Sequence, residues 1–211
     1  MIKLTRPATP EWLAKNYKKW GKKYAEKRAK AMQEGKTPPE FQWATHEGER
    51  VNTKLMPTLV AMTQQHCSYC DNFPVGKDEE KGYISLGQNS IDHFRPKSKF
   101  PKLSYCWYNL FLCCDRCQSN KGEKFCRLWL KPDKEDYDFD KYFIVNYRNG
   151  AISPNQQASR TDQLKALLTI RTLQLDTPAM RRSRLLQFRN FGQNMDINDF
   201  AFRYFLKDKL F

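Results

Sequence analysis

Two Cys-x-x-Cys pairs form the most specific chemical pattern in the sequence, Cys67-Ser-Tyr-Cys70 and Cys114-Asp-Arg-Cys117. Each pair can bring two thiolates to one ion, and four thiolates are a donor set that zinc takes in closed tetrahedral sites. We therefore expect Cys67, Cys70, Cys114 and Cys117 to bind one structural Zn²⁺, with no coordination position left open for catalysis. The other cysteines lack this spacing, and we expect small buried side chains at Cys106, Cys113 and Cys126.

An Asp92-His93 pair lies between the two cysteine pairs, in the stretch SIDHFRPKSKFP. Imidazole titrates near neutral pH and suits the deprotonation of water, whereas a carboxylate suits a hard divalent cation. Phosphodiester hydrolysis uses both, because water must lose a proton and the leaving oxygen gains negative charge. Adjacent residues on a strand face opposite sides, so the pair can serve one phosphate only where a strand ends or bulges. Pro96 favours such an end.

The order of these residues resembles the motif of the HNH (ββα-metal) endonucleases. After Asp92-His93 the motif continues through Asn109 and, nine positions later, Gln118. The resemblance implies that His93 is the general base and that Asp92 and Gln118 hold a catalytic Mg²⁺ or similar divalent cation. It also implies that Asn109 orients the histidine ring or holds its loop. Many members have His or Asn at the third position, so Gln118 is a departure, and Asn120 is the alternative ligand.

Basic side chains surround this motif. The formal net charge is +14, from 37 Lys and Arg against 23 Asp and Glu, which favours nucleic acid as a partner. Lys121 matches the lysine of the family's motif. We expect phosphate contacts from four side chains: Arg95, Lys97, Lys99 and Lys121. Charge alone also leaves open an acidic protein partner or simple solubility.

The elements that must position these residues predict an α+β fold. A basic helix is expected over residues 9–34, because Thr9 can cap it, Pro10 suits its first position and Gly35 can end it. A short apolar helix is expected over residues 57–65, before the first cysteine pair. An exposed excursion is expected over residues 71–88.

Further elements follow the Asp-His pair. The run Asn-Leu-Phe-Leu-Cys before the second cysteine pair indicates a short strand, and the part after Cys117 can begin a helix. Residues 142–152 predict a hairpin with Asn149-Gly150 at its turn. Leucine periodicity predicts helices after Pro154, the second beginning at Thr177-Pro178.

Three regions are expected along the chain. Residues 1–50 form an N-terminal basic helical arm for docking or nucleic-acid contact. Residues 51–130 form a ββα-metal HNH core with the four-cysteine zinc site. Residues 131–211 form the hairpin and the C-terminal helices that pack on the core.

The flanking regions narrow the resemblance. A basic helix after the N-terminal Ile-Lys-Leu-x-Arg-Pro pattern, and a hairpin ending Gly-Ala-Ile-Ser-Pro, are similar to the PtuB-type HNH subunits of Septu anti-phage systems. Effectors of this kind also occur beside retrons. The resemblance implies a role in antiviral defence with a PtuA-like ATPase as partner, and in some assemblies a retron reverse transcriptase with its RNA–DNA. The basic helix is then as plausibly a docking element as a nucleic-acid contact.

Several function classes stay open. DNA is the favoured substrate, and an HNH ribonuclease that cuts structured RNA such as tRNA is an alternative. From a different class, a non-catalytic zinc-ribbon module would bind nucleic acid or protein. Thiol-redox chemistry fits less well, because two cysteine pairs around an HNH-like motif favour zinc. No run reaches the ~18 apolar residues of a membrane helix and no secretory h-region is present, so we expect a cytoplasmic protein.

Overall fold

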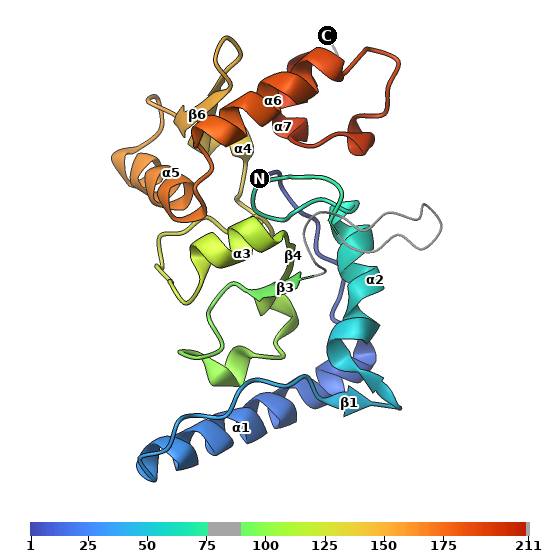
Figure 1. Ribbon diagram of the computed structural model, residues 1–211, viewed down its shortest axis with the longest axis vertical. Coiled ribbons are helices and arrows are strands. Elements are labelled where there is room, and N and C mark those ends of the chain that lie inside the picture. The colour runs from blue at the N-terminus through green and yellow to red at the C-terminus, as the bar shows by residue number, and fades with distance from the viewer. Residues whose placement is uncertain (76–89, 210–211) are drawn as a thin grey trace.

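The computed structural model describes residues 1–75 and 90–209 (Figure 1). Within these ranges, seven α-helices, four short 3₁₀ helices and three two-stranded antiparallel sheets make up the chain, which confirms the expected α+β class. The excursion predicted over residues 71–88 lies outside the described residues from residue 76 onward.

The elements have the following bounds. The α-helices are α1 (Glu11–Gln33), α2 (Val51–Thr63), α3 (Asp115–Lys121), α4 (Phe139–Tyr142), α5 (Arg160–Leu173), α6 (Pro178–Asn190) and α7 (Arg203–Leu206). The paired strands are β1 (Thr45–His46) with β2 (Glu49–Arg50), β3 (Ser90–His93) with β4 (Leu110–Cys113), and β5 (Phe143–Asn146) with β6 (Ala151–Pro154). The 3₁₀ helices are η1 (Pro101–Leu103), η2 (Trp107–Asn109), η3 (Ile197–Asp199) and η4 (Lys207–Lys209).

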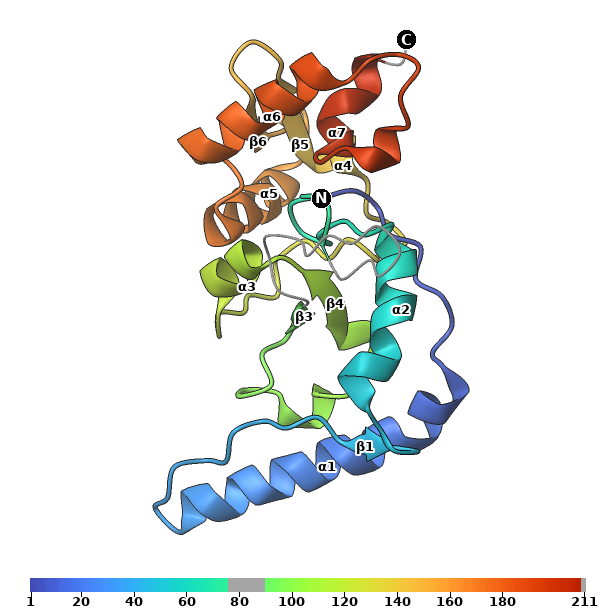
Figure 2. The ribbon, with the colours of Figure 1, turned by 45° about the vertical axis from the view of Figure 1, so that its right-hand side comes forward.

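The centre of the molecule is the hairpin β3–β4 followed directly by α3. The strands pair with Asp92 opposite Phe111 and His93 opposite Leu110. Every residue of β4 is buried, because the hairpin lies between α2 on one side and α3 on the other (Figures 1 and 2). The predicted strand and helices are therefore present, although α2 and α3 both begin earlier in the sequence than expected. The chain order β3–β4–α3 is a ββα unit.

The N-terminal arm crosses one end of this unit. The chain starts near the centre of the molecule, runs along α2 and then turns into α1 (Figure 2). The long basic helix predicted for the arm is confirmed, but it starts one residue later than expected, with Pro10 in the N-cap position. Arg6 anchors the segment, because its guanidinium donates to the carbonyls of Trp107 at 2.9 Å and Leu110 at 3.0 Å. The arm is thus attached to the hairpin.

A close backbone contact seats α1 on η1. Gly21 is buried in α1, and a Cβ added there would collide with the carbonyl of Lys102. No side chain larger than hydrogen fits between the two backbones. The position of α1 relative to the hairpin loop therefore depends on this glycine.

The C-terminal region lies at the opposite end of the molecule. The expected hairpin and helices are present, and Thr177 caps α6 through a bond from the Met180 N–H at 3.3 Å, as predicted. The hairpin turn is longer than the predicted Asn-Gly pair, because residues 147–150 all lie between the strands. Arg184 is completely buried and joins this turn to α7 by donating to Gly150 O and to the Tyr204 hydroxyl.

The burial of Asp71 differs from the prediction. This residue was expected to begin an exposed segment, but it is buried and accepts from the backbone N–H of Arg203 at 2.7 Å. The Arg203 guanidinium also forms an ion pair with it at 2.8 Å. A carboxylate can be buried at low cost only with such partners. The pair therefore fastens α7 to the segment that carries the first cysteine pair.

Gly21→Ala tests the seating of α1. Alanine favours a helix over glycine by about 1 kcal/mol, but the collision with a backbone carbonyl costs about 1–3 kcal/mol. We expect a net loss in the free energy of unfolding and weaker protection of α1 amides in hydrogen exchange. The control is Gly192→Ala, where the added Cβ meets only Met195 at ordinary contact distance. Equal stability of Gly21→Ala and wild type would contradict the close contact.

Candidate metal centre and active site

The four predicted cysteines converge into one buried cluster. The Sγ atoms of Cys67, Cys70, Cys114 and Cys117 all lie within 4.8 Å of one another, and those of Cys70 and Cys114 are 3.6 Å apart. Four sulfurs about 2.3 Å from a tetrahedral zinc ion lie about 3.8 Å from one another. The all-sulfur donor set and the spacing therefore fit structural zinc, and they leave no position for a reacting water.

Local backbone structure positions the two cysteines of each Cys-x-x-Cys pair in the cluster. The first pair forms a turn closed by the Asp71 N–H, which donates to Cys67 O at 2.9 Å. The second pair opens α3, and the Cys114 N–H donates to the Cys67 sulfur at 3.4 Å. Cys113 is buried beside the cluster, and burial raises the pKa of its thiol well above the usual value. It fits the prediction of a small buried side chain, whereas the thiols of Cys106 and Cys126 are half-buried.

Asp92 faces α3 and the interior. Its carboxylate accepts from the Tyr69 hydroxyl at 2.6 Å and from the Lys121 ammonium at 3.1 Å. Lys121 also donates to the carbonyl of His93 at 2.7 Å and is only 2% exposed. Burial raises the pKa of Asp92, and the charge of Lys121 opposes that rise. The carboxylate is therefore the centre of a closed polar cluster.

His93 faces the other side of the strand, as strand geometry requires. Its Nε2 lies 2.8 Å from the carbonyl of Ser104, and a carbonyl can only accept, so this nitrogen carries the proton and Nδ1 carries the lone pair. The ring stacks on Trp43 at 5.5 Å and meets the edge of Phe41 at 5.4 Å. Burial, with a contribution from Lys97, lowers the pKa of His93 to about 3. The imidazole is neutral at pH 7 and covered by residues 41–43.

Asn109 holds the loop that follows β3. Its Oδ1 accepts from the Arg95 N–H at 2.8 Å, and its Nδ2 donates to Arg95 O at 3.0 Å and to Leu103 O at 3.1 Å. The resemblance implied either orientation of the histidine or support of its loop. The contacts are those of loop support, and they reach the histidine only through Ser104, the neighbour of Leu103.

The residues expected to hold a divalent cation do not form a cation site as arranged. Asp92 is engaged by Lys121, whose ammonium brings positive charge to the carboxylate. Gln118 is half-buried on α3, and its side chain has no hydrogen-bond partner among the described residues. The Asn120 amide instead donates to the carbonyl of Leu173 on α5 at 3.3 Å. Within residues 1–75 and 90–209, the thiol cluster is the one group of His, Cys, Asp and Glu placed to hold a metal.

The predicted phosphate contacts divide into two kinds. Arg95 and Lys99 are exposed and Lys97 is half-buried, with its ammonium 5.5 Å from the Phe41 ring centroid. Lys121 does not agree with a surface phosphate contact, because it is buried in its ion pair with Asp92. In this arrangement Lys121, although it occupies the motif position, has a structural role as the partner of Asp92.

Three partners in the site have weak or no sequence signals. Tyr69 sits between the cysteines of the first pair, where a polar aromatic residue could have indicated a buried hydrogen bond. Trp43 and Ser104 carry no such signal, since they reach His93 only through the fold.

No model of a known protein family matches the chain, and no curated protein is significantly similar to it. Among the described residues, no helix is both long and apolar enough to cross a membrane. The function is therefore inferred from the geometry of the site.

Zinc analysis tests the thiol cluster. We expect one Zn²⁺ per purified chain by elemental analysis, and loss of the cooperative thermal transition when a strong chelator removes it. Structural zinc sites contribute about 10–16 kcal/mol, comparable to or above the whole stability of a domain. Cys117→Ser should lose the ion, and the matched control Cys106→Ser should keep it. A chain that unfolds identically with and without chelator would contradict the assignment.

The Asp92–Lys121 pair predicts a second stability effect. Lys121→Met leaves a buried carboxylate without its cation, which costs about 3–5 kcal/mol. The double variant Asp92→Asn/Lys121→Met removes both charges and should recover most of that loss. Chemical denaturation of the three proteins measures the difference. Equal destabilisation by the single and double variants would show that the charge pairing is not what stabilises this cluster.

Proposed function

We propose that the protein is an HNH-type endonuclease that hydrolyses phosphodiester bonds of nucleic acid, with His93 as its general base. The observation that supports this most is the state of His93 at the end of β3 in a ββα unit. Its ring is neutral, Nε2 is held by Ser104, and Nδ1 is the nitrogen that can take a proton. A general base must start neutral with its lone pair free, and it works best when its pKa lies near the working pH. Burial holds the pKa of His93 at about 3, so in this proposal the ring becomes an effective base only once residues 41–43 uncover it.

In the proposed reaction a water molecule loses a proton to Nδ1 of His93. The resulting hydroxide attacks phosphorus, and the bond from phosphorus to the 3′ oxygen breaks. The departing 3′ oxygen takes a proton from a second water molecule, and His93 returns its proton to the solvent. The products carry 5′-phosphate and 3′-hydroxyl ends, as expected for HNH enzymes. Asn109 acts as a positioning residue, because it fixes the loop whose Ser104 carbonyl orients the ring. Access to Nδ1 requires residues 41–43 to move, since Trp43 and Phe41 cover the ring.

A Mg²⁺-like cation is part of this proposal as an expectation of the HNH class. Asp92 and Gln118 are the proposed ligands, with Asn120 as the alternative. Asp92 can take a cation only when its bond to Lys121 breaks. This requirement, together with the cover over His93, is consistent with an effector held inactive until a partner acts. The proposed partner is a PtuA-like ATPase in an anti-phage complex, with a retron reverse transcriptase and its RNA–DNA as a further candidate.

A second candidate function is a non-catalytic zinc module that binds nucleic acid or protein. The closed Asp92–Lys121 pair favours it, because a carboxylate bound to an internal lysine is unavailable to a catalytic metal. The two candidates differ in whether His93 matters for the chain's effect on nucleic acid.

Cleavage assays separate these candidates. Zinc-loaded protein would be incubated with Mg²⁺ or Mn²⁺ and either plasmid DNA or tRNA, using wild type, His93→Ala and the control His46→Ala. We expect cleavage that falls about 10²–10⁴-fold in His93→Ala, the usual contribution of a general base, and persists in His46→Ala. Trp43→Ala should cut faster, because it uncovers His93.

The substrate and the outcome decide between the alternatives. Cleavage of plasmid DNA supports the favoured substrate, and cleavage confined to tRNA supports the ribonuclease alternative. The nuclease proposal would be contradicted if neither wild type nor Trp43→Ala shows cleavage that depends on His93, with or without a co-expressed PtuA-like ATPase. The binding module would then be the remaining candidate.

A further inference from the structure

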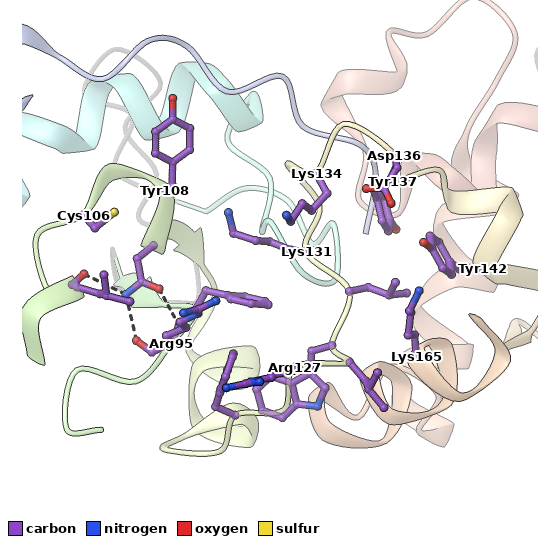
Figure 3. Close-up of a pocket in the computed structure, with 17 residues that line it drawn as sticks. Arg95, Cys106, Tyr108, Arg127, Lys131, Lys134, Asp136, Tyr137, Tyr142 and Lys165 are labelled. Carbon is purple, nitrogen blue, oxygen red and sulfur yellow. Dashed lines mark hydrogen bonds between the residues drawn. The ribbon is translucent and has the colours of Figure 1, made fainter. Parts of the chain in front are cut away.

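A cleft of about 580 Å³ lies between the loop after β3 and the C-terminal region (Figure 3). The loop wall includes Arg95, Tyr108 and Asn109, and the opposite wall comes from the segment after α3 together with α5. His93 is not among the lining residues. The cleft is therefore a concave surface distinct from the covered face of the proposed general base.

The charge of the lining is strongly one-sided. Of the 17 residues drawn in Figure 3, one is a carboxylate, Asp136, and five are cationic. The cationic side chains lie around the open space: Arg95, Arg127, Lys131, Lys134 and Lys165. Such a surface in a concave site concentrates a polyanion. The cleft thus favours anionic ligands, such as those that carry phosphate groups.

Three of these cationic side chains are not neutralised by a carboxylate among the described residues. Lys131 pairs with Asp133 at 2.9 Å and Lys165 with Asp162 at 2.7 Å. In contrast, Arg95, Arg127 and Lys134 are exposed and form no ion pair with any residue in the described part of the chain. An exposed cation without a carboxylate partner has no internal competitor for a phosphate oxygen. These three side chains are therefore the principal anion contacts that the cleft offers.

Aromatic rings accompany the cations. Tyr108 is 56% exposed, an unusual state for a large aromatic side chain, and Phe125 and Trp129 are half-buried at the cleft. The Arg95 guanidinium lies 5.4 Å from the Phe125 ring centroid. Cations interleaved with accessible ring faces are the pattern that holds unpaired bases by stacking and their phosphates by charge. Paired bases in a duplex do not offer their faces in this way.

We propose that this cleft binds a single-stranded segment of nucleic acid. Arg95, Arg127 and Lys134 contact its phosphates, and bases stack on Tyr108 and Trp129. Asn109 lines the cleft and bonds the backbone of Leu103, whose neighbour Ser104 holds His93. A strand in the cleft therefore lies against the loop that positions the proposed base. The inference rests on the proposed function only in taking nucleic acid as the partner, and it needs no hydrolysis.

Fluorescence anisotropy of labelled oligonucleotides tests the proposal. The zinc-loaded full chain would be titrated without added divalent cation against a short single-stranded DNA, the matching RNA and the DNA duplex. The cleft variant is Arg127→Glu/Lys134→Glu, and the matched control is Lys18→Glu/Lys22→Glu, which makes the same charge change on exposed positions of α1. Thermal unfolding would establish that both variants are folded.

We expect single strands to bind more tightly than the duplex. The cleft variant should bind single strands at least tenfold more weakly, and the α1 control less than threefold. The slope of log affinity against log salt concentration should fall by about 1.4 in the cleft variant, about 0.7 for each lost phosphate contact to a single strand. Equal losses in the two charge-reversal variants, or preference for the duplex, would overturn the proposal.

Tyr108 gives a second, charge-independent test. Tyr108→Ala removes the ring and should weaken binding of single strands about five- to hundredfold, the range of one stacking contact. Tyr108→Phe keeps the ring and should bind like wild type. Identical affinities of all three proteins would exclude stacking at this position. Because binding is measured without cleavage, an inactive chain can pass these tests and an active nuclease can fail them.

Discussion

The convergence of four cysteine sulfurs is the constraint on which the rest of the structure depends. It joins the turn after α2 to the start of α3, and the β3–β4 hairpin is enclosed between these two attachments. Burial of four thiols side by side brings little stability unless a cation organises their charge. The Asp71–Arg203 pair extends the same anchor to α7, so the C-terminal region is fastened beside the cluster.

The side chains of Asp92 and His93 lie on opposite faces of β3. Asp92 faces inward and is satisfied by Tyr69 and Lys121, whereas His93 faces outward beneath Trp43 and Phe41. Both groups are deeply buried, and burial shifts each toward its neutral form by raising the pKa of Asp92 and lowering that of His93. The site is therefore chemically closed. Uncovering His93 would require residues 41–43 to move, and freeing Asp92 would require its ion pair with Lys121 to break.

The cleft and the N-terminal arm give the molecule two basic surfaces with different character. Along α1, Lys18 and Lys22 border a shallow hollow with Lys102 of η1, and no aromatic side chain lines it. The cleft combines charge with accessible aromatic rings in a concave site. Both border the loop of residues 94–109 that Asn109 holds. Through this loop, a ligand in the cleft and a partner on the arm would act on the same segment next to His93.

Patterns local in the sequence determined the elements and the cluster of four thiols. Proline and glycine set the ends of α1, Thr177 starts α6, and the spacing of each Cys-x-x-Cys pair places two sulfurs together whatever the rest of the chain does. Contacts between residues distant in the sequence could not be predicted from such local patterns. The burial of Lys121, the cover of Trp43 over His93 and the burial of Asp71 each depend on a partner distant along the chain, and only packing selects that partner. Sequence alone therefore supplied the chemical groups, while the tertiary structure decided which of them are charged, covered or free, because these properties belong to the surroundings of a side chain and not to its type.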